Sequence, residues 1–374
     1  MAIYKLYPYK DATLYSFYEG SNTGLDSIIE AGSILTSEGN SGVFRFLLAF
    51  DQNEINDVIN NKISSSVWQS NLRCYVANAE GINFNSTLYA YAVSGAWDNG
   101  TGHFGDNPIT SDGVSWKWRT YESGSAWETS TYGTYATASF PNNYKGGGVW
   151  LTGSSNPSLN VISSQSFDIR SSKDVNLVVT DIVKGWHSSS FENNGFIVKW
   201  ADSIEFSNSE SIQPDLKLFS VDTHTIYPPE LEFRWRDYNF NTGSSTQTVI
   251  NNSQLYASVT ENPGFFYPES VNKFRINCRP MYPTRIYQTS SIYTNNYYLP
   301  TSSYFAIKDL DTNEYVIDFD DQYTQISADS NSSYFTIYMN GLQPERYYKI
   351  LIKTIINGNT IILDNDYYFK VING

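Results

Sequence analysis

Near its end the chain reads Tyr347-Tyr348-Lys349-Ile350-Leu351-Ile352-Lys353, and shortly afterwards Asn357-Gly358-Asn359 and Thr360-Ile361-Ile362-Leu363. The two outer segments are rich in the β-branched and aromatic side chains that suit a pleated, half-buried surface. Asn-Gly readily adopts the positive φ angles that a tight turn requires, so this is the strongest hairpin signal in the sequence. The stretch therefore predicts a β-hairpin.

Similar short segments surround this hairpin. They are residues 304–307, 315–319, 334–338 and 367–371, with turn-forming residues between them. Strands at spacings of roughly 8–15 residues, separated by turns, are typical of a β-sandwich. The last part of the chain is therefore expected to be a sandwich.

Strand patterns continue toward the N-terminus. Residues 230–236 alternate strictly, as a half-buried strand does, and residues 42–51 form an apolar run expected to be covered on both faces. Further strands are expected at residues 12–18, 72–77, 87–93, 175–180 and 195–200, and a closing strand pair at 204–210 and 214–219. Helical spacing indicates short helices at residues 52–63 and 182–186. The sequence as a whole predicts an all-β protein.

The chain length predicts two or three domains. Its 374 residues exceed one ordinary domain, since domains cluster at roughly 100–200 residues. The segment Thr225-Ile226-Tyr227-Pro228-Pro229 is the expected linker, because two prolines stiffen the chain and neither can donate to a β-ladder. We expect a first domain at residues 1–224, a linker and β-rich middle module at 225–300, and a last module at 301–374.

Composition and charge narrow the class of protein. Aromatic residues make up 16% of the chain and charged residues only 17%, and the formal net charge is −14. A duplex nucleic-acid binder needs Lys and Arg to neutralise phosphates, and an anionic membrane surface also attracts basic segments. We therefore expect no nucleic-acid partner, no membrane insertion, and an acidic surface that favours solubility.

The cysteines and the apolar runs of the sequence indicate the compartment in which the protein acts. Cys74 and Cys278 are expected to be small buried side chains in different domains, without a disulfide or a structural zinc site. The N-terminus lacks the apolar run of a signal peptide, and no stretch approaches the roughly 20 apolar residues of a membrane span. Together with a β-rich, Tyr- and Asn-rich texture, this suggests a virion protein made in a host cytoplasm and carried out by particle assembly.

Four landmarks in residues 10–220 carry a family resemblance. They are Lys10-Asp11-Ala12-Thr13-Leu14 with Asn22-Thr23-Gly24; Phe44-Arg45-Phe46-Leu47-Leu48-Ala49-Phe50-Asp51; Val178-Val179-Thr180-Asp181-Ile182-Val183-Lys184-Gly185-Trp186; and Asn193-Asn194-Gly195-Phe196-Ile197-Val198-Lys199 with Pro214-Asp215-Leu216. Their order resembles the DNRLRE-type domain, a jelly roll of extracellular microbial proteins related to some carbohydrate-binding modules. The resemblance implies an N-terminal jelly-roll-like sandwich.

The two ends of the chain resemble other proteins. Asn340-Gly341-Leu342-Gln343-Pro344 leads into a Tyr-rich segment, which resembles the turn and strand of a fibronectin-III or immunoglobulin-like module. This implies one or two such sandwiches after the jelly roll. The opening Met1-Ala2-Ile3-Tyr4-Lys5-Leu6-Tyr7-Pro8, joined to a jelly roll, looks like structural proteins of tailed bacteriophages.

A search for catalytic and metal-binding motifs returns little. His103, His187 and His224 lie far apart in no ligand-like spacing, and no phosphate loop, dinucleotide fingerprint or nucleophile elbow occurs. Gly146-Gly147-Gly148 is interpreted as a flexible or close-packed loop. The acidic segments 309–314 and 318–321 could hold Ca²⁺ through oxygen ligands, but they read better as turns. We expect no enzyme, no metal and no cofactor.

The loop-rich segment 94–160 holds the candidate binding residues. Trp116, Trp118, Tyr121 and Trp127 lie close together among Gly and Ser, and such rings can stack on sugars or anchor a protein interface. Trp116 and Trp118 are two residues apart and would share one face of a strand. The alternative is that these rings fill the sandwich core or pack the loops.

Two functions from different classes follow. The first is a bacteriophage virion structural protein, a component of the tail, neck or collar, fibre attachment or capsid surface, that acts by assembly with other virion proteins and with copies of itself. The second is a carbohydrate-binding adhesin that recognises a cell-surface glycan. A third hypothesis is an enzyme such as a glycan depolymerase, although no catalytic constellation is visible.

Overall fold

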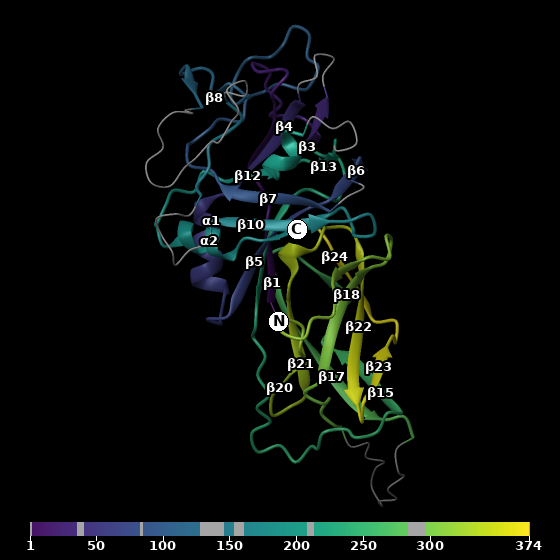
Figure 1. The fold of residues 1–374 in the computed structure, drawn as a ribbon. Coiled ribbons are helices and arrows are strands. Elements are labelled where there is room, and N and C mark those ends of the chain that lie inside the picture. The colour runs from purple at the N-terminus through teal and green to yellow at the C-terminus, as the bar shows by residue number, and fades with distance from the viewer. Residues whose placement is uncertain are drawn as a thin grey trace, which may run out of the picture. The chain divides into compact units, whose positions relative to one another are not determined.

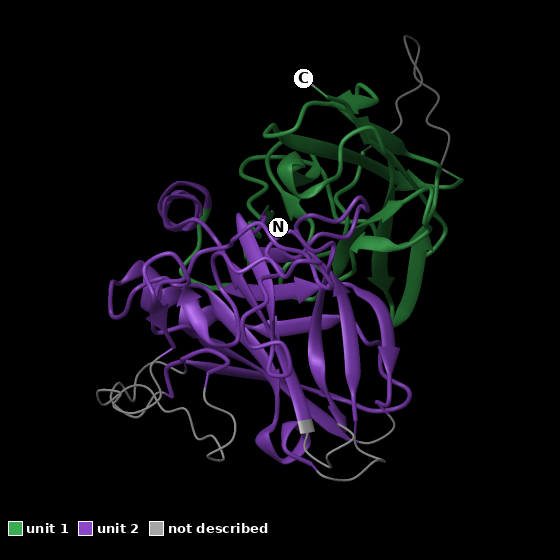
Figure 2. Cartoon of the chain, turned by 90° about the horizontal axis from the view of Figure 1, so that it is seen from above, with its two compact units in different colours: residues 1–5, 63–68, 233–374 green, residues 6–62, 69–232 purple. Residues whose placement is uncertain are grey.

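The computed structural model describes residues 2–35, 41–82, 85–127, 146–152, 161–207, 213–282 and 296–373, and its fold is shown in Figure 1. Strands account for 44% of the structure and helices for 8%. The protein is all-β and its sheets form sandwiches, so the predicted fold class is confirmed. The chain divides into two compact units, coloured separately in Figure 2: unit 1 comprises residues 1–5, 63–68 and 233–374, and unit 2 comprises residues 6–62 and 69–232.

Unit 2 is built around one large antiparallel sheet. Its strands are β2 (Lys10–Tyr15), β3 (Ile28–Leu35), β4 (Ser41–Ala49), β6 (Val76–Glu80), β7 (Ser86–Ala92), β10 (Ile162–Phe167), β12 (Phe196–Trp200) and β13 (Asp215–Phe219). They pair in the order β10-β7-β12-β4-β3-β13-β6, and β2 pairs with β4. Outside this sheet, β11 (Val175–Val178) pairs with β5 (Trp68–Cys74), and β8 (Trp118–Thr120) pairs with β9 (Ser125–Ala126). β1 (Ala2–Leu6), β5 and β14 (Glu230–Trp235) have residues in both units.

The central strand β4 is buried on both faces, as its apolar run predicts. Its described side chains, from Gly42 to Ala49, are all buried, and they include Arg45 at 0% exposure. β12 is likewise buried at every position. A strand covered on both sides loses its polar alternation, which explains the continuous apolar sequence.

Helices are short and connect strands. They are α1 (Gln52–Asp57), η1 (Val58–Lys62), α2 (Thr180–His187), α3 (Asp202–Glu205) and η2 (Met339–Gly341). Asp51 begins α1 because its carboxylate accepts the free backbone N–H groups of Asn53 and Glu54. The helices predicted at 52–63 and 182–186 are both present.

One predicted strand is wrong. Within 204–210, Ile204 and Glu205 end helix α3 instead of forming a strand, and residues 208–210 lie outside the described part of the chain. The helical turn buries both side chains and brings Glu205 to the guanidinium of Arg45. A contact across 160 residues therefore overrides the local β-prone pattern. The partner segment 214–219 does form strand β13.

Unit 1 is a sandwich of two sheets. One sheet has the order β15-β17-β21-β20, and the other β16-β24-β22-β18-β19 with β23 paired to β22. The strands are β15 (Leu255–Thr260), β16 (Phe265–Phe266), β17 (Val271–Pro280), β18 (Ser303–Asp309), β19 (Tyr315–Ile317), β20 (Ser327–Ala328), β21 (Ser333–Tyr338), β22 (Tyr347–Ile356), β23 (Asn359–Leu363) and β24 (Tyr368–Val371).

The core of unit 1 is aromatic and draws on both sides of residue 300. Phe335 stacks on Phe274 at 5.3 Å and on Phe305 at 4.3 Å between ring centroids. Buried residues from 250–278 and from 299–371 share this core. The three-segment division into 1–224, 225–300 and 301–374 stays a prediction.

The predicted hairpin is confirmed. β22 and β23 pair antiparallel, with Ile356 opposite Asn359, so Asn357 and Gly358 form the two-residue turn. Their φ angles are 51° and 79°, the double positive pair of the turn type that Asn-Gly favours.

Both cysteines are free and buried, in different units, as expected. Burial raises the pKa of Cys278 to about 12, and burial followed by the charge of Asp11 raises the pKa of Cys74 well above its ordinary value. Both thiols therefore stay protonated, as small apolar side chains do. No helix in the described residues is long and apolar enough to cross a bilayer.

Candidate functional site

The structure separates the four predicted aromatic residues into two pairs. Trp116 and Trp127 are buried, at 1% and 4% exposure, and belong to the core of unit 2. Trp118 is half-buried and Tyr121 is 45% exposed. Trp116 precedes strand β8 and points into the core, so the expectation that it shares a strand face with Trp118 is wrong.

The buried pair anchors the β8–β9 hairpin. The Gly147 N–H donates to the Trp116 carbonyl at 2.7 Å, and the Trp127 indole N–H donates to the Ser115 carbonyl at 2.9 Å. A Cβ built on Gly147 would lie 2.5 Å from the Trp116 ring, and its φ is 75°. The glycine run 146–148 is thus a close-packed loop that covers the Trp116 ring, one of its two interpretations from sequence.

The exposed pair forms a small aromatic corner. The rings of Trp118 and Tyr121 lie 6.0 Å apart at 82°, and the Lys117 ammonium is 4.7 Å from the centroid of the Trp118 ring. The Tyr121 N–H donates to the Gly113 carbonyl. These contacts hold both rings at the protein surface.

A second aromatic pair is carried by a loop that is hydrogen-bonded to the loop of the first. Tyr18 and Phe104 are 47% and 49% exposed, and their rings lie 5.6 Å apart. The Lys117 N–H donates to the Glu19 carbonyl at 2.9 Å, which joins the two pairs through adjacent backbone. We call Tyr18, Phe104, Trp118 and Tyr121 the aromatic loop surface.

Sequence reasoning missed Tyr18 and Phe104. Phe17-Tyr18 ends the first β-prone segment, and Phe104 follows Gly102-His103, so each was a visible aromatic in or beside a turn. Their proximity arises because Phe104 packs on Tyr15 of strand β2, 4.7 Å away, across almost ninety residues of sequence. No local pattern encodes that contact.

Asn22 ties together the loops that carry the aromatic loop surface. Its side-chain amide is fully buried, donates to the Asn99 and Val114 carbonyls at 2.7 Å each, and accepts from the Gly24 and Gly102 N–H groups. All four hydrogen-bonding positions of the amide are used. The loops are therefore held in one arrangement by a single side chain.

Carboxylates complete the loop network. Asp26 accepts from the Phe104 N–H at 3.0 Å, Asp112 from the N–H and hydroxyl of Thr101, and Glu122 from the Gly113 N–H. Burial raises the pKa of Asp26, and the hydrogen bond from Phe104 opposes that shift. These acids are engaged with backbone and so stiffen the surface.

Beneath the hairpin lies a buried charge network. Arg45 donates to both carboxylate oxygens of Glu205, at 2.9 and 2.6 Å, and to the Gly147 carbonyl at 2.8 Å. Lys199 lies 3.1 Å from Glu205 and also pairs with Asp202. The guanidinium is 5.1 Å from the Trp116 ring centroid. The network links the central sheet to the loop that covers Trp116.

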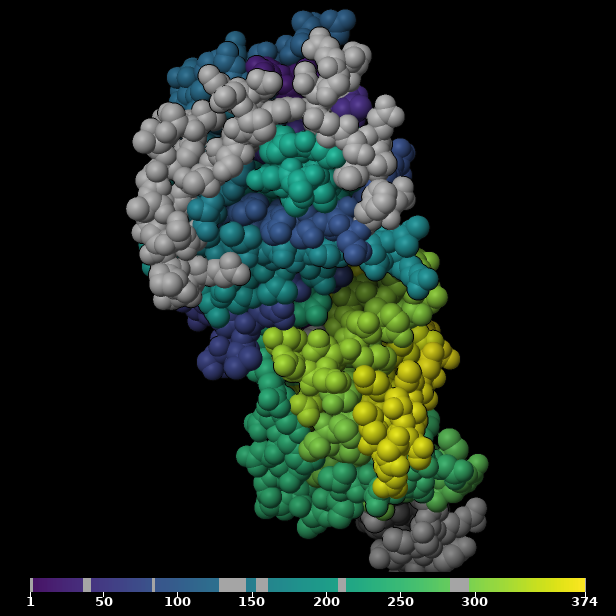
Figure 3. Space-filling model, in the orientation of Figure 1, coloured from purple at the N-terminus to yellow at the C-terminus, as the bar shows by residue number. Residues whose placement is uncertain are grey.

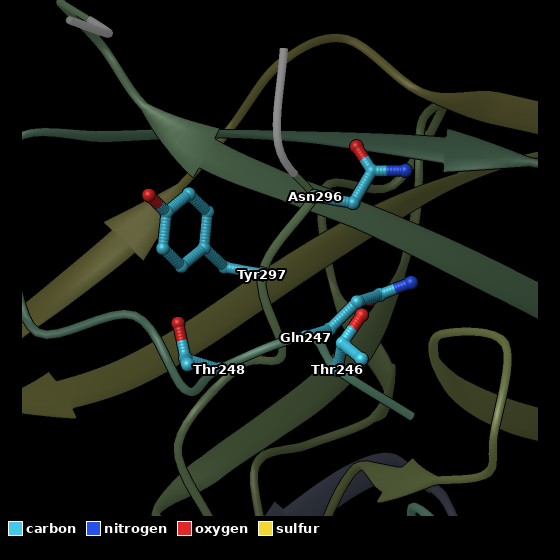
Figure 4. Close-up of a pocket in the computed structure, with 5 residues that line it drawn as sticks. All are labelled: Thr246, Gln247, Thr248, Asn296 and Tyr297. Atoms are coloured by element: carbon cyan, nitrogen blue, oxygen red, sulfur yellow. The ribbon is translucent and has the colours of Figure 1, made fainter. Parts of the chain in front are cut away.

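Unit 1 contains a hollow of about 310 Å³, lined by Thr246, Gln247, Thr248, Asn296 and Tyr297. Figure 4 shows these side chains around it, contributed by two segments of the chain. The lining is polar and uncharged. It therefore offers hydrogen bonds but no carboxylate or imidazole for acid–base chemistry.

The residues weighed for metal binding are engaged elsewhere. His103 lies 3.6 Å from Asp26, and the ring of His187 bonds to Asn56. Asp309 accepts from the Asp311 and Thr312 N–H groups within the β18–β19 turn, as the turn interpretation predicts. Among the described residues no group of three or more His, Cys, Asp or Glu side chains could hold a metal ion.

Comparison with known proteins does not assign a family. No protein-family model matches the sequence, and no curated protein sequence matches it. Among solved structures, the chain aligns with a DUF4785 family protein from Legionella pneumophila at 7% identity and a TM-score of 0.16. The alignment covers 99% of this chain and 61% of that protein, so this chain spans about three fifths of that protein's length.

What the aromatic loop surface can do follows from its geometry. Three exposed rings and the half-buried ring of Trp118 stand on loops with hydrogen-bonded backbone groups, so little ordering remains for a binding event. Rigid aromatic side chains are the usual anchors of protein interfaces and of sugar contacts. The arrangement suits recognition of a partner.

Proposed function

We propose that this chain is a non-enzymatic structural component of a tailed-bacteriophage virion, in the tail, neck or collar, fibre attachment or capsid surface. The observation that carries the proposal is the aromatic loop surface, Tyr18, Phe104, Trp118 and Tyr121, held by the fully bonded side chain of Asn22. In this role the surface contacts another virion protein or a further copy of the chain. The particle, assembled in the host cytoplasm, is its place of action.

Support for assembly comes from the way the surface is built. A binding surface that is ordered beforehand loses less conformational entropy on association. Trp and Tyr are also enriched among the residues that contribute most to interfaces. The sequence resemblance to phage structural proteins adds the biological setting.

The test combines particle composition with one double variant. We expect mass spectrometry of purified particles to detect the chain, and Trp118→Ala with Tyr121→Ala to reduce its incorporation by roughly tenfold or more, as for loss of interface anchors. Ile169→Ala, which alters a 71% exposed side chain, is the control and should leave incorporation unchanged. Absence of the chain from particles contradicts the proposal.

A second candidate is glycan binding by the same surface. It is favoured by the half-buried Trp118 ring, which stands at 82° to Tyr121 and beside Lys117, an arrangement that can stack on a sugar. We expect Trp118→Ala to abolish binding on a glycan array in that case. Array binding that is absent, or that survives this substitution, excludes it.

A further inference from the structure

The outer face of one sheet of unit 1 carries lysines and tyrosines on neighbouring strands. In one row Tyr368 on β24 is paired with Lys349 on β22, which is paired with Lys308 on β18, which is paired with Tyr315 on β19. Since neighbouring strands are about 4.8 Å apart, this row spans about 14 Å. Directly opposed residues share a face, so all four side chains point outward.

Neighbouring rows repeat the pattern. Tyr347 on β22 is opposite Lys370 on β24, and Lys353 on β22 is opposite Tyr304 on β18. We call these eight outward lysines and tyrosines the lysine–tyrosine face. Tyr315, Tyr347 and Tyr368 are 43%, 46% and 53% exposed in the whole chain, so this face is accessible. Figure 3 shows the yellow atoms of the last part of the chain as a continuous exposed surface.

The four lysines fall into two kinds. Lys349 lies 2.7 Å from Asp364 and 2.9 Å from Asp366, and Lys370 pairs with Glu345. Within the described ranges, Lys308 and Lys353 have no carboxylate within ion-pair distance.

Aromatic rings take the place of carboxylates around those two lysines. Lys308 lies 5.2 Å from the centroid of the Tyr315 ring, and Lys353 lies 4.8 Å from Tyr304 and 5.1 Å from Phe319. Ring contacts hold an ammonium group in place but do not neutralise its charge. Among the residues that the structure describes, no carboxylate therefore pairs with Lys308 or Lys353, and both can bind an anion.

The charge distribution of the chain sharpens this contrast. Unit 1 contains 12 Lys and Arg residues against 13 Asp and Glu residues, a net charge of −1, whereas unit 2 contains 12 against 25, a net charge of −13. The acidic excess of the protein therefore belongs to unit 2. On the lysine–tyrosine face, the charges of Lys349 and Lys370 are matched by their own carboxylates, so its binding capacity for an anion rests on Lys308 and Lys353. Asp321 adds to the effect of burial in raising the pKa of Tyr304.

The apolar content of the face argues against a protein partner. Ala306 and Leu351, paired between the lysine rows, are 0% and 5% exposed, so they offer a partner almost no apolar surface. A protein interface normally has an apolar centre that becomes fully desolvated. This face offers ring surfaces and ammonium groups spread over a flat sheet.

We propose that the lysine–tyrosine face binds a linear acidic polysaccharide of the uronate type. Its carboxylates lie at Lys308 and Lys353, and its sugar rings pack on Tyr304 and Tyr315. Aromatic rings pack against the apolar faces of sugars, and ammonium groups make charge-assisted hydrogen bonds with carboxylates. This site is separate from the aromatic loop surface, and it does not depend on the assembly function.

The test measures binding of polygalacturonate to the full chain by isothermal titration calorimetry. The unaltered chain binds polygalacturonate and not the neutral polymer dextran. The double variant Lys308→Gln, Lys353→Gln binds polygalacturonate at least roughly tenfold more weakly, because it loses one to two charge-assisted contacts. Tyr304→Ala weakens binding as well, which a purely electrostatic attraction does not predict.

A matched control lies on the other sheet of the same unit. Lys273 on β17 also stands over a tyrosine, 4.1 Å from the Tyr334 centroid, but pairs with Asp329 at 4.0 Å. Lys273→Gln removes one positive charge and leaves the affinity within about twofold, as expected for a distant surface charge. Circular dichroism verifies that each variant is folded.

Absence of polygalacturonate binding by the unaltered chain overturns the proposal, and so do three further outcomes. They are unchanged polygalacturonate affinity in the folded double variant, equal competition by polyglutamate, which would indicate an acidic protein partner, and equal competition by single-stranded DNA, which would indicate unspecific polyanion binding. Loss of polygalacturonate binding with none of these competitors effective supports it.

Discussion

Arg45 holds a full positive charge at the centre of unit 2, where its side chain is 0% exposed. Glu205, also 0% exposed, neutralises it and contacts Lys199 as well. Removing one member of a buried ion pair is costly because the remaining charge stays without water or partner. Stability at this position therefore depends on the whole network.

We expect Glu205→Gln to lower the free energy of unfolding by about 3–5 kcal/mol, the usual cost of breaking a buried pair. Urea denaturation followed by tryptophan fluorescence measures this. Glu192→Gln is the control, because Glu192 is exposed and its loss should change stability by less than about 0.5 kcal/mol. A Glu205→Gln variant as stable as the control would show that the network adds nothing.

Asp11 makes the stability of unit 2 depend on pH between about 4 and 8. Burial raises its pKa to about 8, the Val221 N–H acting in the opposite direction. Because the folded state then holds a proton that the unfolded state has already released above pH ~4, stability falls as pH rises from ~4 to ~8. The slope is at most about 1.4 kcal/mol per pH unit.

We expect Asp11→Asn to flatten that decline, so that the variant gains stability relative to the unaltered chain at pH 9 but not at pH 4. Thermal melts across this range provide the measurement. Parallel curves for the two proteins would mean that Asp11 titrates normally in the folded state.

Among the elements, the β22–β23 hairpin rests on its turn. Gly358 has a φ of 79°, and a Cβ there would meet nothing within 4 Å. Gly358→Ala therefore tests backbone strain alone, and we expect it to destabilise the protein by about 1 kcal/mol. Gly20→Ala is the matched control: its surroundings are equally open and its φ is not in the left-handed region. Equal denaturation midpoints for the two variants would contradict this.

The loops that are hydrogen-bonded to the Asn22 side chain give a second prediction at this scale, about their stability. Asn22→Ala leaves two carbonyls and two N–H groups without their partner, and each unmet buried group costs about 1–3 kcal/mol. We expect faster hydrogen exchange at the Gly24 and Gly102 amides and weaker partner binding by the aromatic loop surface. Asn61→Ala, which alters an exposed side chain bonded only to Asp57, should change neither.

For the whole molecule, the charge is divided very unequally, −13 on unit 2 and −1 on unit 1. Like charges destabilise a compact state through repulsion, and salt screens them. We expect added NaCl to raise the melting temperature of unit 2 more than that of unit 1. Hydrogen exchange during heating measures this, with the amides of β4 reporting on unit 2 and those of β22 on unit 1. Equal shifts would indicate that net charge does not limit the stability of unit 2.

Local patterns along the chain predicted many of the strands, the helices at 52–63 and 182–186 and the Asn357-Gly358 turn, because backbone preference and side-chain alternation act over a few residues. They did not predict β3 or β15. They also named Trp118 and Tyr121 as candidates, but together with Trp116 and Trp127, which are buried. Short-range preferences cannot tell which of several similar rings enters the core. The ring of Trp116 is covered by the glycine loop at residues 146–148, which lies about thirty residues away in the sequence.

Long-range contacts account for the groupings of side chains that local patterns missed. Glu205 lies in a helix, where its carboxylate contacts Arg45. Phe104 lies beside Tyr18 because it packs on Tyr15. Lysines from β18, β22 and β24 form rows because these strands pair. Such groupings depend on which strands become neighbours, and that is settled by burying the largest apolar area of the entire chain. A segment can encode its own conformation, but its partners are chosen by the packing of all the others.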